Sequence, residues 1–115
     1  MKFVLKVGDK DLVVPEFKVL GYKNREDIIV IAMSGIEKSD FDILNRKISQ
    51  GKFNIEMENS VLGLTIDNKM YVFDLEDYIT YEDDDYLETF KVAFTYIDAN
   101  GVVSKENISA IGMQS

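Results

Sequence analysis

Residues 27–33 read DIIVIAM and form the most apolar, β-branched stretch of the chain. A run of this composition is typical of a strand that is buried on both faces. Such a strand is too hydrophobic for a solvent-exposed edge, where its free backbone groups would pair with other chains. The stretch therefore predicts a buried strand that is covered within the domain or by another chain.

The residues before this stretch predict two further strands. Residues 1–7 alternate in the pattern of a half-buried strand, and 8–10 supply a turn. Residues 12–19 then form the return strand, with Pro15 inside it. Because proline cannot donate a hydrogen bond to a ladder, Pro15 predicts an edge position or a bulge. The buried face of the first strand is predicted to carry Phe3, Leu5 and Val7.

A short helix is predicted over residues 40–49. Ser39 has the side chain of a good N-cap, and Asp42 stands three residues later, as in a capping box. Gly51 is the expected stop, because glycine readily adopts the left-handed conformation that ends a helix. Three apolar residues fall on one helical face, at i, i+3 and i+7: Phe41, Leu44 and Ile48.

Strand patterns return after the helix. Residues 53–58 alternate apolar and polar side chains. Residues 61–66 and 70–81 flank Asp-Asn-Lys at 67–69, which is typical of a tight hairpin turn. Residues 86–97 alternate most regularly of all, so they predict another strand.

The two long C-terminal segments are expected to pair as one β-hairpin over residues 70–97, with its tip at 82–85. The fold class that follows is mainly β, an antiparallel β-sandwich or split β-barrel, with one short α-helix near residues 40–49. The 115 residues suit a single domain, 1–115. The weak pattern of 104–115 predicts a mobile C-terminal segment.

Two absences limit the chemistry that this chain can perform. It contains no cysteine and no histidine, so thiolate metal sites, disulfides and histidine-based catalysis are excluded. The acidic residues lack the spacing and glycine of a calcium loop, and no glycine-rich phosphate loop is present. We therefore expect no catalytic residues, no bound cofactor and no metal site.

The formal net charge of −8 arises in one segment. Residues 70–90 contain no lysine or arginine. Such a segment repels nucleic acid and anionic membranes and attracts basic partners. The alternative is a solvated hairpin tip that keeps the chain soluble. Its acidic residues are Asp74, Glu76, Asp77, Glu82, Asp83, Asp84, Asp85 and Glu88.

Tyrosines crowd the same segment, and tyrosine is enriched at protein interfaces. The hairpin is therefore the candidate protein-binding surface, and we expect a homo-oligomer in which the flanks 71–81 or 86–96 are partly buried between copies. The candidate partner-binding residues are Asp77, Tyr78, Tyr81, Glu82, Asp83, Asp84, Asp85 and Tyr86.

The N-terminal sequence MKFVLKVGDKD does not read as a signal peptide, because Lys6 interrupts its apolar stretch. No apolar run approaches the length of a membrane-spanning helix. We expect an intracellular protein, or part of an assembly that is built inside a cell, with no membrane partner.

The order of segments resembles that of known phage proteins. MKFVLKVGDKDLVVPEFKVL leads to DIIVIAM, then SDFDILNRKIS, then KMYVFDLEDYITYEDDDYLETFKVAFTYID. This layout, over residues 1–97, is similar to small tail and baseplate-associated proteins of phages and prophages from low-GC Gram-positive bacteria. The resemblance implies a β-barrel or β-sandwich module with one helix that assembles into rings or onto a tail tip. It identifies no functional residues.

Two hypotheses about function follow. The first is a non-enzymatic phage or prophage structural module that acts through protein–protein contacts. The alternative is an acidic phage-encoded inhibitor, an anti-defence protein whose carboxylates imitate nucleic-acid phosphates in a basic protein groove. Binding by such an inhibitor would weaken steeply with salt, because it depends on exposed charge.

Overall fold

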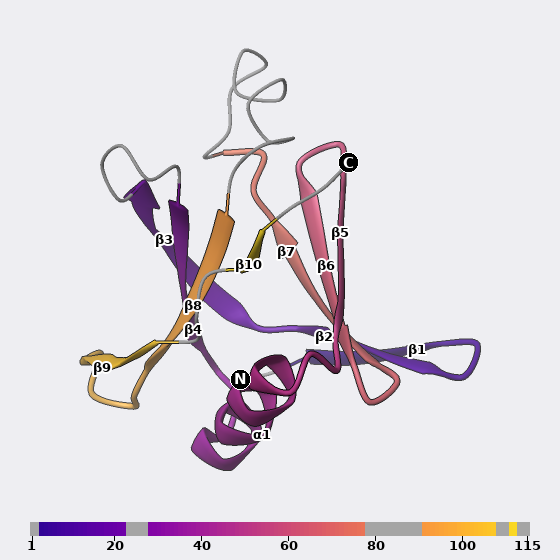
Figure 1. Cartoon of the computed structure of the whole chain (residues 1–115), viewed down its shortest axis with the longest axis horizontal. Helices are drawn as coiled ribbons and strands as arrows, with labels where there is room; N and C mark the ends of the chain where they lie inside the picture. Colours follow the sequence, from indigo (N-terminus) through magenta and orange to yellow (C-terminus); the bar gives the residue numbers. More distant parts are fainter. Residues whose placement is uncertain (1–2, 23–27, 78–90, 108–110, 113–115) are drawn as a thin grey trace.

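The computed structural model describes residues 3–22, 28–77, 91–107 and 111–112. Two mixed β-sheets pack against each other, and the helix α1 (Lys38–Ser49) closes one end of the space between them (Figure 1). Sheet A has the strand order β1-β2-β7-β6-β5, and sheet B has the order β10-β8-β4-β3 with β9 also paired to β8. The prediction of a mainly β fold with one short helix is confirmed.

The strands of sheet A are β1 (Phe3–Val7), β2 (Lys10–Val14), β5 (Asn54–Glu58), β6 (Val61–Ile66) and β7 (Lys69–Asp74). Those of sheet B are β3 (Glu16–Tyr22), β4 (Ile28–Ser34), β8 (Lys91–Ile97), β9 (Val103–Asn107) and β10 (Ile111–Gly112).

Most of the pairing is antiparallel, as predicted, but each sheet also contains a parallel pair. β2 pairs parallel with β7, and β4 pairs parallel with β8. The long hairpin predicted over 70–97 is also wrong in its described part. Its two strands do not pair, because β7 lies in sheet A and β8 lies in sheet B. β7 and β8 each carry aromatic side chains on the side that faces the core. Packing these two sides against each other buries the aromatic side chains of both strands. The rings of Phe73 and Phe94 have centroids 5.3 Å apart across the core.

Pro15 marks the point where the chain leaves one sheet for the other. The single return strand predicted over 12–19 is therefore wrong: β2 ends before Pro15, and β3 begins after it. The missing N–H of proline interrupts the ladder, and Pro15 itself is buried. This break allows one continuous stretch of chain to contribute to both layers.

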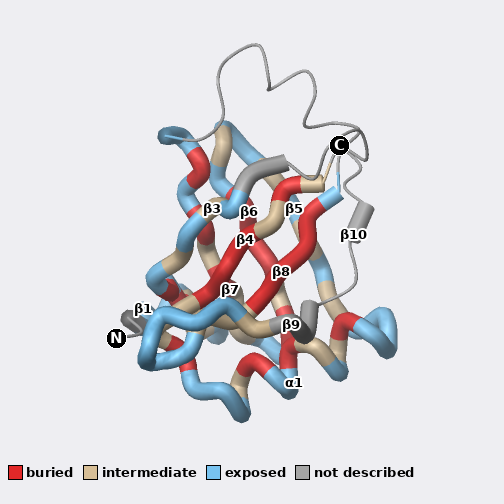
Figure 2. Tube along the Cα trace, turned by 90° about the vertical axis from the view of Figure 1, so that its left-hand side faces the viewer, coloured by how far each residue is buried: buried red, intermediate tan, exposed pale blue. Residues whose placement is uncertain are grey.

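The stretch around β4 behaves as predicted. β4 lies between β3 and β8 in the interior of sheet B, and Figure 2 shows that β4 and β8 are buried along most of their length. Ile29, Ile31 and Met33 point into the core with exposed fractions of at most 2%. The strand is thus covered within the domain.

The helix begins two residues earlier than predicted. Its N-cap is Glu37, which makes no side-chain capping hydrogen bond, so the capping box predicted from Ser39 and Asp42 is wrong. Asp42 instead accepts a hydrogen bond from the ammonium group of Lys38, 2.6 Å away. The predicted end is confirmed, since Gly51 has a φ of +72°. The predicted buried face, Phe41, Leu44 and Ile48, is also confirmed.

Two of the three side chains on the predicted buried face of the first strand, Leu5 and Val7, are exposed, whereas the side chain of Phe3 lies outside the described ones. In β1, Val4, Leu5 and Val7 are 43%, 45% and 62% exposed. The reason is position: among the described strands, β1 lies at the edge of sheet A and pairs with β2 alone, and the hairpin of β1 and β2 reaches away from the body (Figure 1). An edge strand without a layer above it cannot bury a face.

The described part of the C-terminal segment 104–115 lies against sheet B. β9 and β10 both pair antiparallel with β8, and the hydroxyl of Thr95 donates to the backbone oxygen of Ser104 at 3.0 Å. The other residues of the segment that was predicted to be mobile lie outside the described residues. Within the described part of the chain, no helix is long and apolar enough to span a membrane.

Candidate protein-binding surface

Of the residues predicted to bind a partner, only Asp77 lies within the described residues. Asp77 is exposed in a turn that follows β7. The others, Tyr78, Tyr81, Glu82, Asp83, Asp84, Asp85 and Tyr86, lie outside the described residues. Within the described residues, β7 and β8 do not pair as the hairpin that was expected to present them, because they belong to different sheets.

The described tyrosines at the ends of that predicted surface contribute to the core instead. Tyr71 is 5% exposed. Tyr96 is half-buried, with its ring centroid 5.4 Å from that of Phe41, and its hydroxyl donates to the backbone oxygen of Ile36 at 3.3 Å. Tyr71 and Tyr96 therefore hold the domain together and are not free to cover another copy.

A different surface has the character of an interface: the outer face of sheet A, on the side away from sheet B. Strand register places Leu12 beside both Leu5 and Met70, and Val72 follows Met70 two residues later on the same side. Of the described elements, none lies over this face (Figure 1). Its described apolar side chains, all exposed or half-buried, are Leu5, Val7, Leu12, Val14, Val61, Met70 and Val72.

A groove crosses this face where Gly63 has no side chain. Its volume is about 320 Å³. A Cβ placed on Gly63 would lie 3.5 Å from Cγ of Glu56 and 3.6 Å from Sδ of Met70, so an alanine side chain there would make ordinary van der Waals contacts with both neighbours. It is lined by Glu56, Glu58, Asn59, Val61, Gly63, Met70 and Val72.

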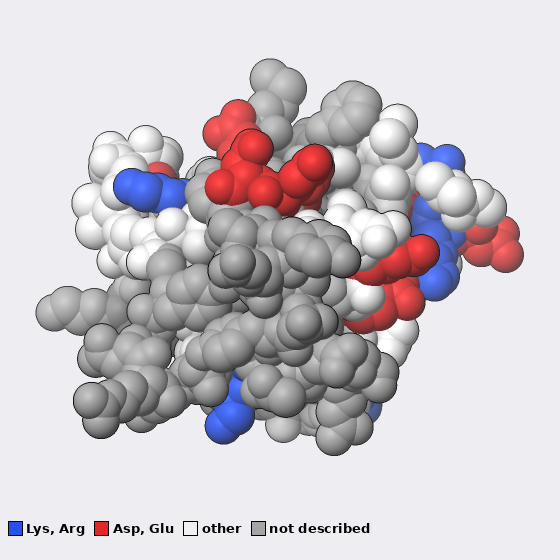
Figure 3. All heavy atoms as spheres, turned by 90° about the horizontal axis from the view of Figure 1, so that it is seen from above, with Lys and Arg blue, Asp and Glu red and all other residues white. Residues whose placement is uncertain are grey.

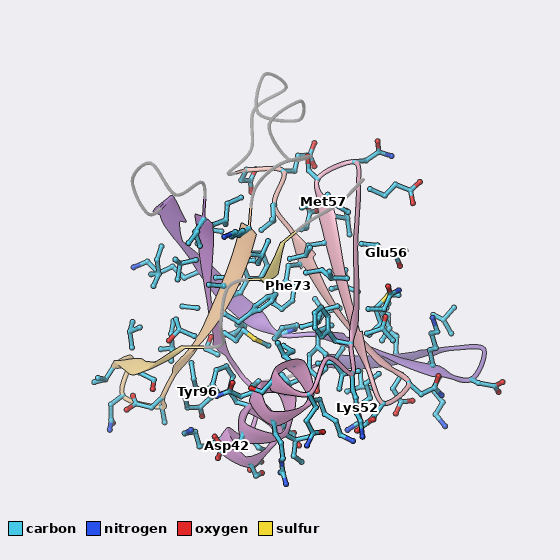
Figure 4. All side chains as sticks on the ribbon, viewed as in Figure 1. Asp42, Lys52, Glu56, Met57, Phe73 and Tyr96 are labelled. Atoms are coloured by element: carbon cyan, nitrogen blue, oxygen red, sulfur yellow. The ribbon has the colours of Figure 1, made fainter. Side chains whose placement is uncertain are left out.

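Charges mark opposite corners of this face. Glu56 and Glu58 lie on the edge strand β5, and Figure 4 shows Glu56 on the outer side of that strand. Asp74 is at the same end of the sheet as Glu58, because both are level with Val61. Lys10 lies at the other end, exposed on β2. Within the described residues, neither Glu56 nor Glu58 forms an ion pair.

Acidic side chains are prominent on the end of the molecule seen in Figure 3. Asp74, Glu76 and Asp77 are all exposed near this end, where β7 finishes. The amide of Glu76 donates to the Asp74 carboxylate at 3.0 Å. Where they are described, the acidic residues of segment 70–90 thus point to solvent.

No family model matches this chain, and neither a curated protein nor a solved structure matches it. The outer face of sheet A must therefore be interpreted from its own chemistry.

A smaller cavity lies beneath the helix, with a volume of about 150 Å³. Burial, together with the nearby negative charges of Asp40 and Asp67, raises the pKa of Tyr71 to about 12. A phenol with this pKa stays neutral at physiological pH and cannot act as a base. Its lining residues are Asp40, Ile43, Leu44, Ile66, Asp67, Lys69 and Tyr71. Across the described parts of the chain, no three Asp or Glu residues are grouped so that they could hold a metal ion.

The raised pKa of Tyr71 predicts a loss of stability at alkaline pH. A tyrosine in the unfolded chain ionises near pH 10, whereas folded Tyr71 ionises near pH 12. The stabilising effect is complete below pH 10 and is lost as the pH rises toward 12, because the unfolded state releases its proton first. We expect a decline of about 1.4 kcal/mol per pH unit in this window.

Urea unfolding at a series of pH values, with Tyr71→Phe as the control, measures this effect. The variant lacks the ionisable hydroxyl, so its free energy of unfolding should fall less steeply between pH 10 and pH 12. Parallel curves for the two proteins would show that Tyr71 ionises normally in the folded state.

The sequence carried a signal for the surface that was missed. Three of the strands carry apolar residues at consecutive positions, so both sides of each strand are apolar there. These positions are Val13-Val14, Val61-Leu62 and 70–73. In each pair or run, one set of side chains points into the core and the other lies on the outer face of sheet A. Apolar residues on both sides predict a strand covered on both sides, but here only one cover lies within the described domain.

Proposed function

We propose that this chain is a non-enzymatic module that acts through protein–protein contacts. The observation that carries the proposal is the outer face of sheet A, where apolar side chains stay uncovered over several adjacent strands. Soluble monomers rarely expose a contiguous apolar surface of this kind, and such surfaces are typical of binding sites. Leu5, Val14 and Val61 are 45%, 39% and 37% exposed.

Within that class we propose a structural role in a phage or prophage particle, as a component of the tail or baseplate. The support is the resemblance in the order of sequence segments, together with a fold of the general class that the resemblance implies: two β-sheets and one helix. A tail component must bind neighbouring copies or other virion proteins, which requires uncovered apolar faces such as this one. The chain would occur in the host cytoplasm during assembly and afterwards in the virion.

Particle purification tests this role. A tagged copy of the chain is expressed in the strain that carries its gene, particles are induced and purified, and their proteins are identified by mass spectrometry. We expect the tagged chain to sediment with the particles and to survive washing at high salt. If the chain is found only in the soluble fraction while particles assemble normally, the structural role is wrong.

The second candidate is an acidic inhibitor that occupies a basic groove on a host protein. It is favoured by the run of acidic residues in 70–90, a segment without lysine or arginine. The two candidates differ in their response to salt. Capture by an acidic mimic should weaken steeply as salt increases, because it relies on exposed charge. Capture through the outer face of sheet A should persist, because apolar burial is not screened.

A further inference from the structure

The outer face of sheet A is complementary to itself. Its centre is apolar, at Leu12, Val14 and Val72, so a second copy of the same face would bury like against like. Two identical faces that meet around a two-fold axis form an isologous contact, in which both copies contribute the same surface patch.

The charged corners decide how the two copies would be oriented. Lys10 lies on β2, two residues before Leu12 and therefore outside the apolar centre. It stands at the end of the face where the turn joins β1 to β2. Glu56 and Glu58 lie on β5, at the opposite edge of the sheet. A two-fold axis can lie in the plane of the contact, along the diagonal that passes through neither of these corners. Such an axis brings the Lys10 corner of each copy over the Glu56 and Glu58 corner of the other.

The competing orientation is disfavoured by charge. A two-fold axis perpendicular to the strands, in the plane of the interface, would place β5 over β5 and bring the glutamates of both copies together. Like charges facing each other across an interface suppress association. The diagonal axis avoids this and makes the strands of the two sheets cross steeply, as in the known class of orthogonal sheet packing.

We infer that the outer face of sheet A is covered by a second copy of this chain, in a two-fold dimer with crossed sheets and reciprocal contacts between Lys10 and Glu56 or Glu58. This inference rests on the proposed function, because it assumes that the face is a contact surface, and it names the partner. The exposed hairpin of β1 and β2 gains a cover in this dimer, since Leu5 belongs to the same face.

Analytical ultracentrifugation of the whole chain, from low to high micromolar concentration, tests the dimer. Val14→Glu places a carboxylate at the centre of the contact, and we expect it to weaken dimerisation roughly a hundredfold. Val102→Glu is the matched control: it makes the same change at a side chain that is 61% exposed outside sheet A. The control should dimerise like the unmodified chain.

Charge reversal tests the orientation. One variant protein carries Lys10→Glu, and a second carries both Glu56→Lys and Glu58→Lys. We expect self-association of each variant to weaken roughly tenfold, because both reciprocal contacts become repulsive. Mixing the two proteins should restore the dimer, since every reversed charge then meets its opposite. Misfolded variants would not recover on mixing, so recovery supports the inference directly.

Three results would overturn the inference. One is a strict monomer at every concentration, another is dimerisation unchanged by Val14→Glu, and the third is a mixture that associates no better than its separate components. The proposed function would survive these results if the face cross-links to a different protein, so the two proposals can fail separately.

Discussion

Replacing Phe73 with alanine is expected to lower the free energy of unfolding by about 3–5 kcal/mol, as for other fully buried aromatic residues. Phe73 is 0% exposed, and Figure 4 shows it between the two sheets. Its ring centroid is 5.4 Å from that of Phe17 and 5.3 Å from that of Phe94. Because Phe73 belongs to sheet A and both partners belong to sheet B, the substitution leaves a cavity where the two layers meet.

Denaturant unfolding monitored by far-ultraviolet circular dichroism measures this loss. Val103→Ala is the control, because Val103 lies on β9, away from the outer face of sheet A, and is 41% exposed. We expect the control to change stability by about 1 kcal/mol or less. A Phe73→Ala variant no less stable than the Val103→Ala control would contradict the two-layer packing.

Phe41→Ala is the substitution expected to detach the helix, again with a loss of about 3–5 kcal/mol. Phe41 is 0% exposed, and it packs on Tyr96 with the ammonium of Lys38 5.5 Å from its ring centroid. It therefore joins α1 to sheet B. No other described helix closes that end of the molecule, so no neighbouring element can compensate for the lost contact.

The matched control is Ile43→Ala on the same helix, since Ile43 is 40% exposed. Its effect should stay within about 1 kcal/mol, because a large part of the side chain already contacts water. Comparing the two variants by amide hydrogen exchange separates helix detachment from global unfolding. If Phe41→Ala leaves protection in α1 unchanged, the helix is held by other contacts.

Local features of this fold could be predicted from the sequence because they depend on neighbouring residues. The helical face of Phe41, Leu44 and Ile48 follows from a period of 3.6 residues. The tight turn between β6 and β7 follows from Asp67 and Asn68, which adopt φ values of +49° and +66°. Such positive values are tolerated best by glycine, asparagine and aspartate.

Sheet membership could not be predicted in the same way, because it depends on residues far apart in the chain. β7 and β8 are consecutive in the described part of the chain, and each alternates like half of a hairpin. Alternation shows which side of a strand is apolar, but it does not distinguish pairing edge to edge from packing face to face. The break at Pro15 was visible, whereas the change of sheet that it permits was not.

The candidate binding surface was missed for a related reason. The sequence drew attention to acidic residues and tyrosines in 70–90, since these types stand out in composition. The outer face of sheet A is built from ordinary apolar residues on strands distant in sequence, and only the register of β2, β7 and β6 places them together.

The most direct test of the account is site-specific photo-cross-linking in the cell that carries the gene. A photoreactive phenylalanine analogue replaces Val14, on the outer face of sheet A, or Val102, which is exposed outside it. We predict that the probe at position 14 forms covalent adducts, with a second copy of this chain or with another protein, and that the probe at position 102 forms few. Equal labelling from both positions, or none from position 14, would contradict the claim that this face is a protein-binding surface.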